Sequence, residues 1–190
     1  MIHLITGGSG SGKSVYAENW LIRQGGREAC GKEKPFLYIA TMRPFGQESR
    51  QKIMRHRNQR AGKGFATLEC YQDMEALEIP ENAGILLECV MNLTANESYR
   101  EDGNDVRAKG EDRVAEKVLE GIRHLSEHTA YLAVVTGQVD GDIDSYSEET
   151  RTYQKVLGEI NRRLARLAGT VTEVVYGIPV HHKKQPEEER

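Results

Sequence analysis

The chain has few cysteines, no long apolar run and almost no excess of one charge. Its 190 residues include three cysteines, Cys30, Cys70 and Cys89, an odd number without a CxxC pair. Disulfide and metal scaffolds use paired cysteines, so we expect neither, and a reducing cytoplasm is the predicted setting. No apolar stretch approaches the roughly 20 residues of a membrane span, and the N-terminus does not resemble a secretory signal.

The charge balance excludes further classes of partner. The formal net charge is −3, so the sequence carries no electrostatic footprint for nucleic acid or an anionic membrane. Apolar residues make up 38% and charged residues 29% of the chain, which is typical of a globular protein. We expect one nucleotide-binding catalytic domain, residues 1–184, followed by a frayed polar tail, residues 185–190.

Short apolar runs alternate with longer amphipathic ones along the chain. This pattern predicts an α/β fold in three layers, with a mostly parallel sheet and helices on both faces. The predicted strands are Ile2–Thr6, Phe36–Ala40, Gly84–Glu88, Tyr131–Thr136 and Val171–Tyr176, with a weaker strand at Phe65–Glu69 and an edge strand at Val180–Lys183. The predicted helices are Ser14–Gln24, Ser49–Arg60, Arg113–His128 and Glu148–Leu167, and the polar stretch 99–112 is predicted to be a mobile surface loop.

The stretch GGSGSGKS, residues 7–14, lies between the first predicted strand and the first predicted helix. Its spacing is the complete Walker A pattern. Glycines let main-chain N–H groups converge on phosphate oxygens, and the helix N-terminus directs its positive end at the same anion. Lys13 can reach the β- and γ-phosphates, and the Ser14 hydroxyl can bind Mg²⁺. The pattern predicts a P-loop NTPase-like fold that holds a nucleoside triphosphate through Gly7, Gly8, Ser9, Gly10, Ser11, Gly12, Lys13 and Ser14.

Glu88 ends the apolar stretch ILLEC, where P-loop proteins place an acidic residue near magnesium. Taken alone, a carboxylate at a strand end is usually a solvated terminus. Beside a Walker A pattern, we predict that Glu88 is catalytic. It would lie near Mg²⁺ and either orient a metal-bound water or accept the proton of an attacking hydroxyl.

The predicted helix Ser49–Arg60 places several cations around one histidine. Lys52, His56 and Arg60 share one face at 100° per residue. Nearby cations disfavour an imidazolium, so we predict a neutral, nucleophilic ring, and the same cations can neutralise a phosphate under attack. From the pattern alone, a solvated basic helix with an incidental histidine is the simpler interpretation.

The stretch KIMRHRNQR, residues 52–60, resembles the R-I-x-x-H-x-x-x-R segment of the bifunctional adenosylcobinamide kinase/adenosylcobinamide-phosphate guanylyltransferases. The similarity continues in order along nearly the whole chain. ITGGSGSGKSVYAE resembles the family's P-loop, FLYIAT its second strand, ATLEC its T-x-E segment and ILLEC its acidic strand end; GEINRRLARLA and EVVYGIPV resemble its closing helix and strand. Many families share a P-loop, but the P-loop combined with this histidine helix is specific.

The resemblance implies two reactions that assemble the nucleotide loop of cobalamin. ATP or GTP, with Mg²⁺, phosphorylates the aminopropanol hydroxyl of adenosylcobinamide. His56 then attacks the α-phosphorus of GTP and carries GMP as a phosphoramidate, which the cobinamide phosphate accepts. The resemblance further suggests a homotrimer, with nucleotide sites near subunit boundaries.

Matching residues in the family imply additional nucleotide contacts, at Ile39, Ala40, Thr41, Arg57, Asn58, Gln59, Arg60, Glu69 and Glu88. The carboxylate of Glu69 suits guanine, whose N1–H and N2 amine both donate. The chain departs from the family at Gly137-Gln138-Val139, where Asn-Glu-Val is usual, and at Lys52, where Arg is usual. If the usual glutamate serves cobinamide, the neutral Gln138 weakens the kinase step.

Other polar residues have structural interpretations. His124 and His128 are four apart on a helix but lack a third ligand, which favours a solvated pair, and His181 and His182 alternate across a strand. Trp20 is predicted to be core, and Cys89 a small buried hydrophobe.

Two other functions stay open. The chain could be a P-loop kinase for another hydroxyl substrate, with His56 doing no covalent work. It could also be a GTP-binding regulator, although the sequence has no base-recognition motif of the Asn-Lys-x-Asp kind.

Overall fold

The computed structural model describes residues 1–28, 36–80, 84–100, 110–139 and 147–184. The predicted tail, 185–190, and most of the predicted loop, 99–112, lie outside the described residues.

The described strands form one seven-stranded sheet in the order β3-β2-β4-β5-β1-β6-β7. Their bounds are β1 Ile2–Thr6, β2 Phe36–Ala40, β3 Phe65–Glu69, β4 Gly84–Leu87, β5 Leu132–Val135, β6 Thr170–Val175 and β7 Ile178–Lys183. Every neighbouring pair is parallel except β6 and β7, which form an antiparallel hairpin at the edge. All residues of β4 and β5 are buried, as expected for parallel strands covered on both faces.

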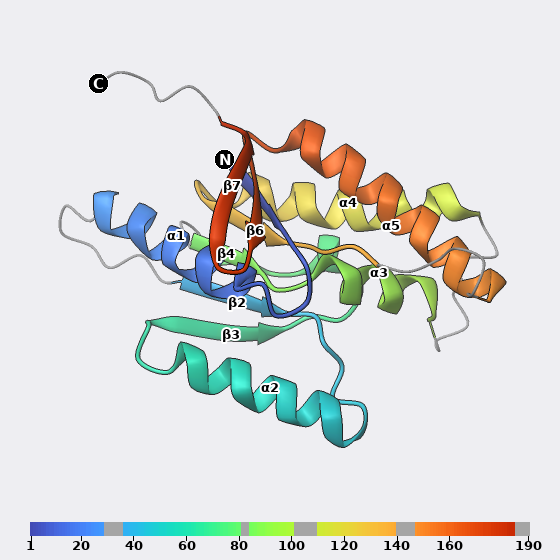
Figure 1. The fold of residues 1–190 in the computed structure, drawn as a ribbon, viewed down its shortest axis with the longest axis horizontal. Coiled ribbons are helices and arrows are strands. Elements are labelled where there is room, and N and C mark those ends of the chain that lie inside the picture. Colours follow the sequence, from blue (N-terminus) through green and yellow to red (C-terminus); the bar gives the residue numbers. More distant parts are fainter. Residues whose placement is uncertain (29–35, 81–83, 101–109, 140–146, 185–190) are drawn as a thin grey trace.

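Helices cover both faces of this sheet, which confirms the three-layer α/β prediction (Figure 1). The helices are α1 Lys13–Glu28, α2 Gly46–Arg60, α3 Val90–Ser98, α4 Glu111–Glu127 and α5 Glu148–Leu167, with one 3₁₀ turn, η1, at Met74–Ala76. One core lies under α3, α4 and α5 and includes Ile122 and Leu164. The other lies under α1 and includes Leu21 and Tyr38.

The amphipathic periodicity explains α4 and α5. The predicted stripe of α4, which includes Val118 and Ile122, is buried against the sheet. Helix α5 begins at its N-cap Ser147, whose hydroxyl accepts a hydrogen bond from the Thr150 N–H at 3.3 Å. None of the described helices combines the length and apolar character needed to cross a membrane.

Helix α2 lacks an apolar face and lies along the β3 edge of the sheet (Figure 1). Its inner side is formed by Ser49, Ile53 and His56, which are half-buried, and by the buried Arg60. Because so little apolar surface is covered, the helix is held mainly by polar contacts near its C-terminal end.

Several predicted bounds were wrong at the ends. Helix α4 begins inside the predicted loop, at Glu111, while Glu88 and Thr136 lie just beyond β4 and β5. Tyr176 belongs to the hairpin turn, and β7 starts earlier than predicted, at Ile178. Helix α3 and the turn η1 were not predicted, because both are too short to show a clear period.

Candidate functional site

Residues 7–12 form a loop between β1 and α1, as the Walker A pattern requires. Gly7, Gly10 and Gly12 have positive φ angles of 148°, 71° and 92°. A Cβ on Gly7 would lie 2.4 Å from the Val174 carbonyl oxygen of β6. The glycines therefore allow both the turn of the loop and its close approach to the sheet.

Lys13 and Ser14 open α1 directly after the loop. The Lys13 ammonium donates to the Gly8 carbonyl at 2.9 Å, so it lies over the loop. Burial lowers the pKa of Lys13, and the nearby Cys89 opposes this shift. Cys89 lies between the end of β4 and the start of α3. Because Cys89 is near Lys13, the ammonium faces the side of the loop where β4 ends.

Glu88 and Thr41 meet at the carboxyl ends of β4 and β2. The Thr41 N–H donates to Glu88 Oε2 at 3.3 Å, and the Thr41 hydroxyl donates to the Cys89 carbonyl at 2.9 Å. Asn96 of α3 donates to the Thr41 carbonyl at 2.8 Å. The predicted contacts at Ile39, Ala40 and Thr41 thus lie beside the predicted carboxylate, because the ends of parallel strands share one edge.

A second group of predicted residues gathers where α2 meets β3. Arg57 pairs with Glu69 at 2.7 Å, and the Tyr71 hydroxyl donates to the same carboxylate at 2.7 Å. Partial burial and this hydrogen bond raise the pKa of Tyr71 to about 12. Arg60 is buried, with its guanidinium 3.2 Å from the centre of the Tyr38 ring.

His56 lies on the inner side of α2 within this second group. Its Nδ1 is buried and has no hydrogen-bond partner in the described part of the chain. Lys52, predicted to share its face, instead faces solvent and pairs with Glu48 at 2.7 Å. Asn58 is exposed, and the side chain of Gln59 lies outside the described residues.

The predicted site residues therefore form two groups rather than one. Figure 1 shows α2 at the β3 edge, away from the loop between β1 and α1. Tyr38 of β2 lies between the two groups. The Arg60 guanidinium stacks on its ring from one group. Burial raises the pKa of the Tyr38 hydroxyl, and the nearby Glu88 of the other group raises this pKa further. The sequence suggested a shared site but did not indicate this separation.

The unusual Gly137-Gln138 pair follows β5, beside the glycine-rich loop. A Cβ on Gly137 would lie 2.8 Å from Met91 Sδ and 3.5 Å from the Gly7 carbonyl oxygen. Asn161 of α5 donates to the Gly137 carbonyl at 3.0 Å and accepts from the Thr136 hydroxyl at 2.7 Å. Met91 thus occupies the space that a larger residue at 137 would need, while Gln138 is exposed.

The remaining predictions about single residues have mixed outcomes. Trp20 is core, as predicted. His181 contacts Thr172 and His182 contacts Glu173, so the two histidines have separate partners. Cys89 was predicted to be buried but is partly exposed.

His124 and His128 show no sign of a metal site. His124 contacts the Leu77 carbonyl at 2.9 Å, and His128 the carbonyl of His124 at 2.8 Å. Across the described ranges, no group of three or more His, Cys, Asp or Glu residues could hold a metal ion.

Sequence reasoning missed two contacts that shape the site. Lys63, after α2, pairs with the buried Glu18 of α1 at 2.6 Å. The Gly177 N–H of the β6–β7 turn donates to the Ser11 carbonyl at 2.8 Å and so supports the loop. The first pair joins residues 45 apart in sequence, and no local pattern marks either contact.

The donor set suits a magnesium–nucleotide complex. Mg²⁺ takes oxygen ligands, usually one or two from protein, with the rest from phosphates and water. A hydroxyl at Ser14 and a carboxylate at Glu88 match that chemistry, and the loop N–H groups match the phosphates.

The chain was compared with protein families, with curated proteins and with solved structures. The chain is 28% identical to the bifunctional adenosylcobalamin biosynthesis protein CobU of Salmonella typhimurium, with 96% of this chain and 100% of the relative covered. It is 29% identical to the protein of the same name from Escherichia coli, with the same coverage. A solved structure, the flagellar accessory protein FlaH from Methanocaldococcus jannaschii, aligns with a TM-score of 0.43 at 11% identity, covering 97% of this chain and 78% of that one. Residues 3–182 match the family model CobU, described as cobinamide kinase / cobinamide phosphate guanyltransferase, and the chain therefore belongs to that enzyme family.

Proposed function

We propose that this enzyme phosphorylates the aminopropanol hydroxyl of adenosylcobinamide and then transfers GMP to the new phosphate through a covalent intermediate on His56. The observation that carries the proposal is the pair of separate groups in one chain. One is a phosphate-binding loop with Lys13, and the other surrounds a histidine with Arg57, Arg60 and Glu69.

In the kinase step, the substrate hydroxyl attacks the γ-phosphorus and the bond to the β-phosphate oxygen breaks, leaving a nucleoside diphosphate. Lys13 and the loop N–H groups stabilise charge on the transferring group. Glu88 accepts the hydroxyl proton. Ser14 and Glu88 would hold Mg²⁺, which neutralises phosphate charge when bound.

In the transfer step, His56 attacks the α-phosphorus of GTP, and the bond to the β-phosphate breaks to release pyrophosphate. Because Nδ1 is buried, Nε2 is the nitrogen that can reach the nucleotide. An oxygen of cobinamide phosphate then attacks the same phosphorus, breaking the N–P bond and restoring the imidazole. Splitting one displacement into two in this way is characteristic of covalent catalysis.

Arg60 supports a phosphate beside His56. It is only 6% exposed, yet its Nε and Nη1 have no hydrogen-bond partner among the described residues. Buried donors are normally satisfied, so an anion at this position would complete their bonding. Glu69 would accept hydrogen bonds from guanine when its pair with Arg57 opens.

His56 must approach a nucleotide at the loop, either by movement of α2 or by contact with another copy. The weak apolar packing of α2 favours movement. Exposed apolar residues at the β7 edge, with Ile178 66% exposed, favour self-association into the proposed trimer. Sedimentation analysis of wild type and Ile178→Lys tests that assembly.

The deciding experiment is incubation with α-³²P-GTP and Mg²⁺. Wild type should acquire acid-labile, alkali-stable label, and His56→Ala should acquire none. His128→Ala removes an exposed histidine elsewhere and should label normally. An unlabelled wild type would remove the guanylyl half of the proposal.

The separation of α2 from the loop favours one alternative, a P-loop kinase in which His56 does no covalent work (Figure 1). Such an enzyme would phosphorylate its substrate but would acquire no label from α-³²P-GTP. His56→Ala would then leave every detectable activity intact.

A further inference from the structure

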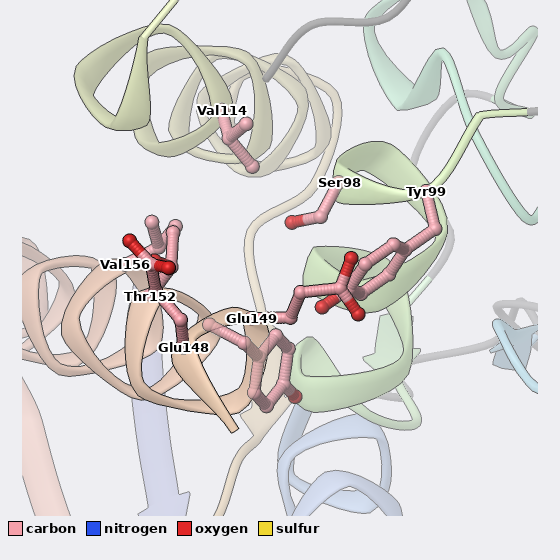
Figure 2. A pocket seen from close by; sticks show the side chains of 8 residues that line it. Ser98, Tyr99, Val114, Glu148, Glu149, Thr152 and Val156 are labelled. Carbon is pink, nitrogen blue, oxygen red and sulfur yellow. The ribbon is translucent and has the colours of Figure 1, made fainter. Parts of the chain in front are cut away.

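A cavity of about 220 Å³ lies between α3, α4 and α5. Figure 2 shows Ser98 and Tyr99 on one side, Val114 across from them, and Glu148, Glu149, Thr152 and Val156 along α5. Tyr153 completes the lining. This volume is too small for a corrin ring but takes a side arm of one.

The cavity is close to the phosphate-binding loop. The Tyr153 hydroxyl donates to the Met91 carbonyl at 2.9 Å. The Met91 sulfur packs on Gly137, which adjoins Gly7 of the loop. Tyr153 and Lys13 are also both close enough to Cys89 for its charge to affect their pKa values. Tyr153, Met91 and Gly137 therefore connect the cavity to the loop that precedes Lys13.

The cavity also lies on the side of the loop where an acceptor must approach. Glu88 follows β4 and Gln138 follows β5, so both residues lie on the β4–β5 side of β1, and the γ-phosphate that Glu88 is proposed to serve would lie on that side too. An acceptor hydroxyl attacks roughly in line with the leaving oxygen, from beyond the γ-phosphate. Helices α3 and α5, which frame the cavity, cover this side.

The lining has the chemistry of a site for amides. Val114 and Val156 contribute to a mostly apolar lining, and the Ser98 and Thr152 hydroxyls and the Glu148 and Glu149 carboxylates are its few polar groups. The Ser98 hydroxyl points into the open space in Figure 2. A primary amide can donate from its nitrogen to a carboxylate such as Glu148 and accept at its oxygen from a hydroxyl. A few polar contacts of this kind fix the orientation of a ligand in an otherwise apolar pocket.

We propose that this cavity binds a neutral amide side chain of the corrinoid substrate and so directs its acceptor arm toward the γ-phosphate. The inference rests on the proposed function, because it assumes a corrinoid acceptor. Cobinamide carries several such amides around its ring, next to the arm that is phosphorylated. The cavity would thus bind the corrinoid substrate and not the nucleotide.

The test compares two tryptophan substitutions on α5. Thr152→Trp fills the cavity, whereas Lys155→Trp adds the same side chain at an exposed position outside the lining. Cobinamide binding is followed by equilibrium dialysis, and GTP labelling of His56 is measured in parallel. Thr152→Trp should weaken cobinamide binding at least tenfold and leave the labelling rate unchanged, while Lys155→Trp matches wild type in both.

Unchanged cobinamide binding by Thr152→Trp would overturn the inference and leave the proposed function intact. A wild type that binds no cobinamide would overturn both. If Thr152→Trp loses GTP labelling as well, its fold is disturbed and a second variant is needed. Glu148→Gln serves this purpose, because it removes one exposed charge from the cavity lining and keeps the shape of the side chain. Weaker cobinamide binding by Glu148→Gln, with normal labelling, supports the site, and wild-type binding rejects it.

Discussion

The guanidinium of Arg60 stacks on the ring of Tyr38, 3.2 Å from its centre. The two side chains belong to α2 and β2, and both are almost fully buried. This contact fixes the C-terminal end of a helix that otherwise has little apolar packing. It therefore couples the position of His56 to the centre of the sheet.

Loss of this stacking should affect both stability and GMP transfer. Tyr38→Leu removes the ring, and we expect the free energy of unfolding to fall by about 2 kcal/mol, with slower labelling of His56. Tyr38→Phe keeps the ring and should stay near wild type in both. Urea unfolding and α-³²P-GTP labelling measure the two effects. Wild-type labelling by Tyr38→Leu would show that the contact does not position α2.

Variants at Lys13 and at His56 should affect the two reactions differently. Lys13→Ala removes a cation from the triphosphate site, so both phosphorylation and GMP transfer should fall by about 100-fold or more. His56→Ala should abolish transfer alone. Phosphorylation of cobinamide with γ-³²P-labelled nucleotide and labelling with α-³²P-GTP distinguish these outcomes. Equal loss of phosphorylation in the two variants would contradict the division of roles.

Gln138 provides a test of the departure from the family pattern. Gln138→Glu restores a carboxylate at an exposed position beside the loop, and we expect kinase turnover to rise by about tenfold if it acts as an acid or base. Gln138→Ala is the matched control, because it changes the side chain without adding charge. Labelling of His56 should not change in either. Equal kinase rates for Glu and Gln at 138 would exclude a role for charge there.

The ion pair between Lys63 and Glu18 should matter chiefly for stability. Glu18 has only 1% of its side chain exposed, so Lys63→Met leaves a buried carboxylate without its cation. We expect the free energy of unfolding to fall by about 3 kcal/mol. The double variant Glu18→Leu, Lys63→Met removes both charges and should recover most of that loss. Urea titrations of wild type, the two single variants Lys63→Met and Glu18→Leu, and the double variant give the coupling energy, and additive losses would argue against a paired contact.

His3 should make the fold sensitive to mild acid. It contacts Thr172 at 2.8 Å and packs beside Trp20. Burial, with a smaller effect from His181, lowers its pKa to about 4 from 6.5. As pH falls from 6.5 to about 4, the unfolded chain binds a proton that the folded chain excludes. Stability is therefore full above pH 6.5 and decreases through this window, by roughly 3 kcal/mol in total.

His3→Gln removes this linkage while retaining a polar side chain. Urea unfolding at pH 7 and at pH 4.5 should show a smaller decrease for the variant than for wild type. An identical decrease in both proteins would assign the acid sensitivity to other groups.

Local patterns were sufficient for much of the fold and for the position of the glycine-rich loop between β1 and α1. The Walker A spacing depends on consecutive residues, and the stripes of α4 and α5 repeat within one helix. Thr41 and Glu88 were each predicted at a strand end, and the structure brings them together because neighbouring parallel strands end at the same edge of the sheet. By contrast, the stacking of Arg60 on Tyr38 joins two elements, and no periodicity specifies such a pair.

The site was less predictable than the fold for the same reason. The sequence indicated that His56 and the loop belong to one enzyme, but the sheet order determines how far apart they lie. Helix α3 was missed because it is one short helix without a strong stripe, although it supplies Met91 and Asn96. The glycine at position 137 is explained by Met91 of α3, whose sulfur occupies the space that a side chain at 137 would need.

Gly7 is usually regarded as a residue of phosphate chemistry, yet its lack of a side chain also lets the loop lie close to the Val174 carbonyl of β6. Any side chain there would force two neighbouring strands of the central sheet apart. An inactive variant at position 7 would consequently report a damaged scaffold and say nothing about catalysis. Gly8, with no neighbouring atom within 4 Å of an added Cβ, is the glycine at which chemistry and architecture can be told apart.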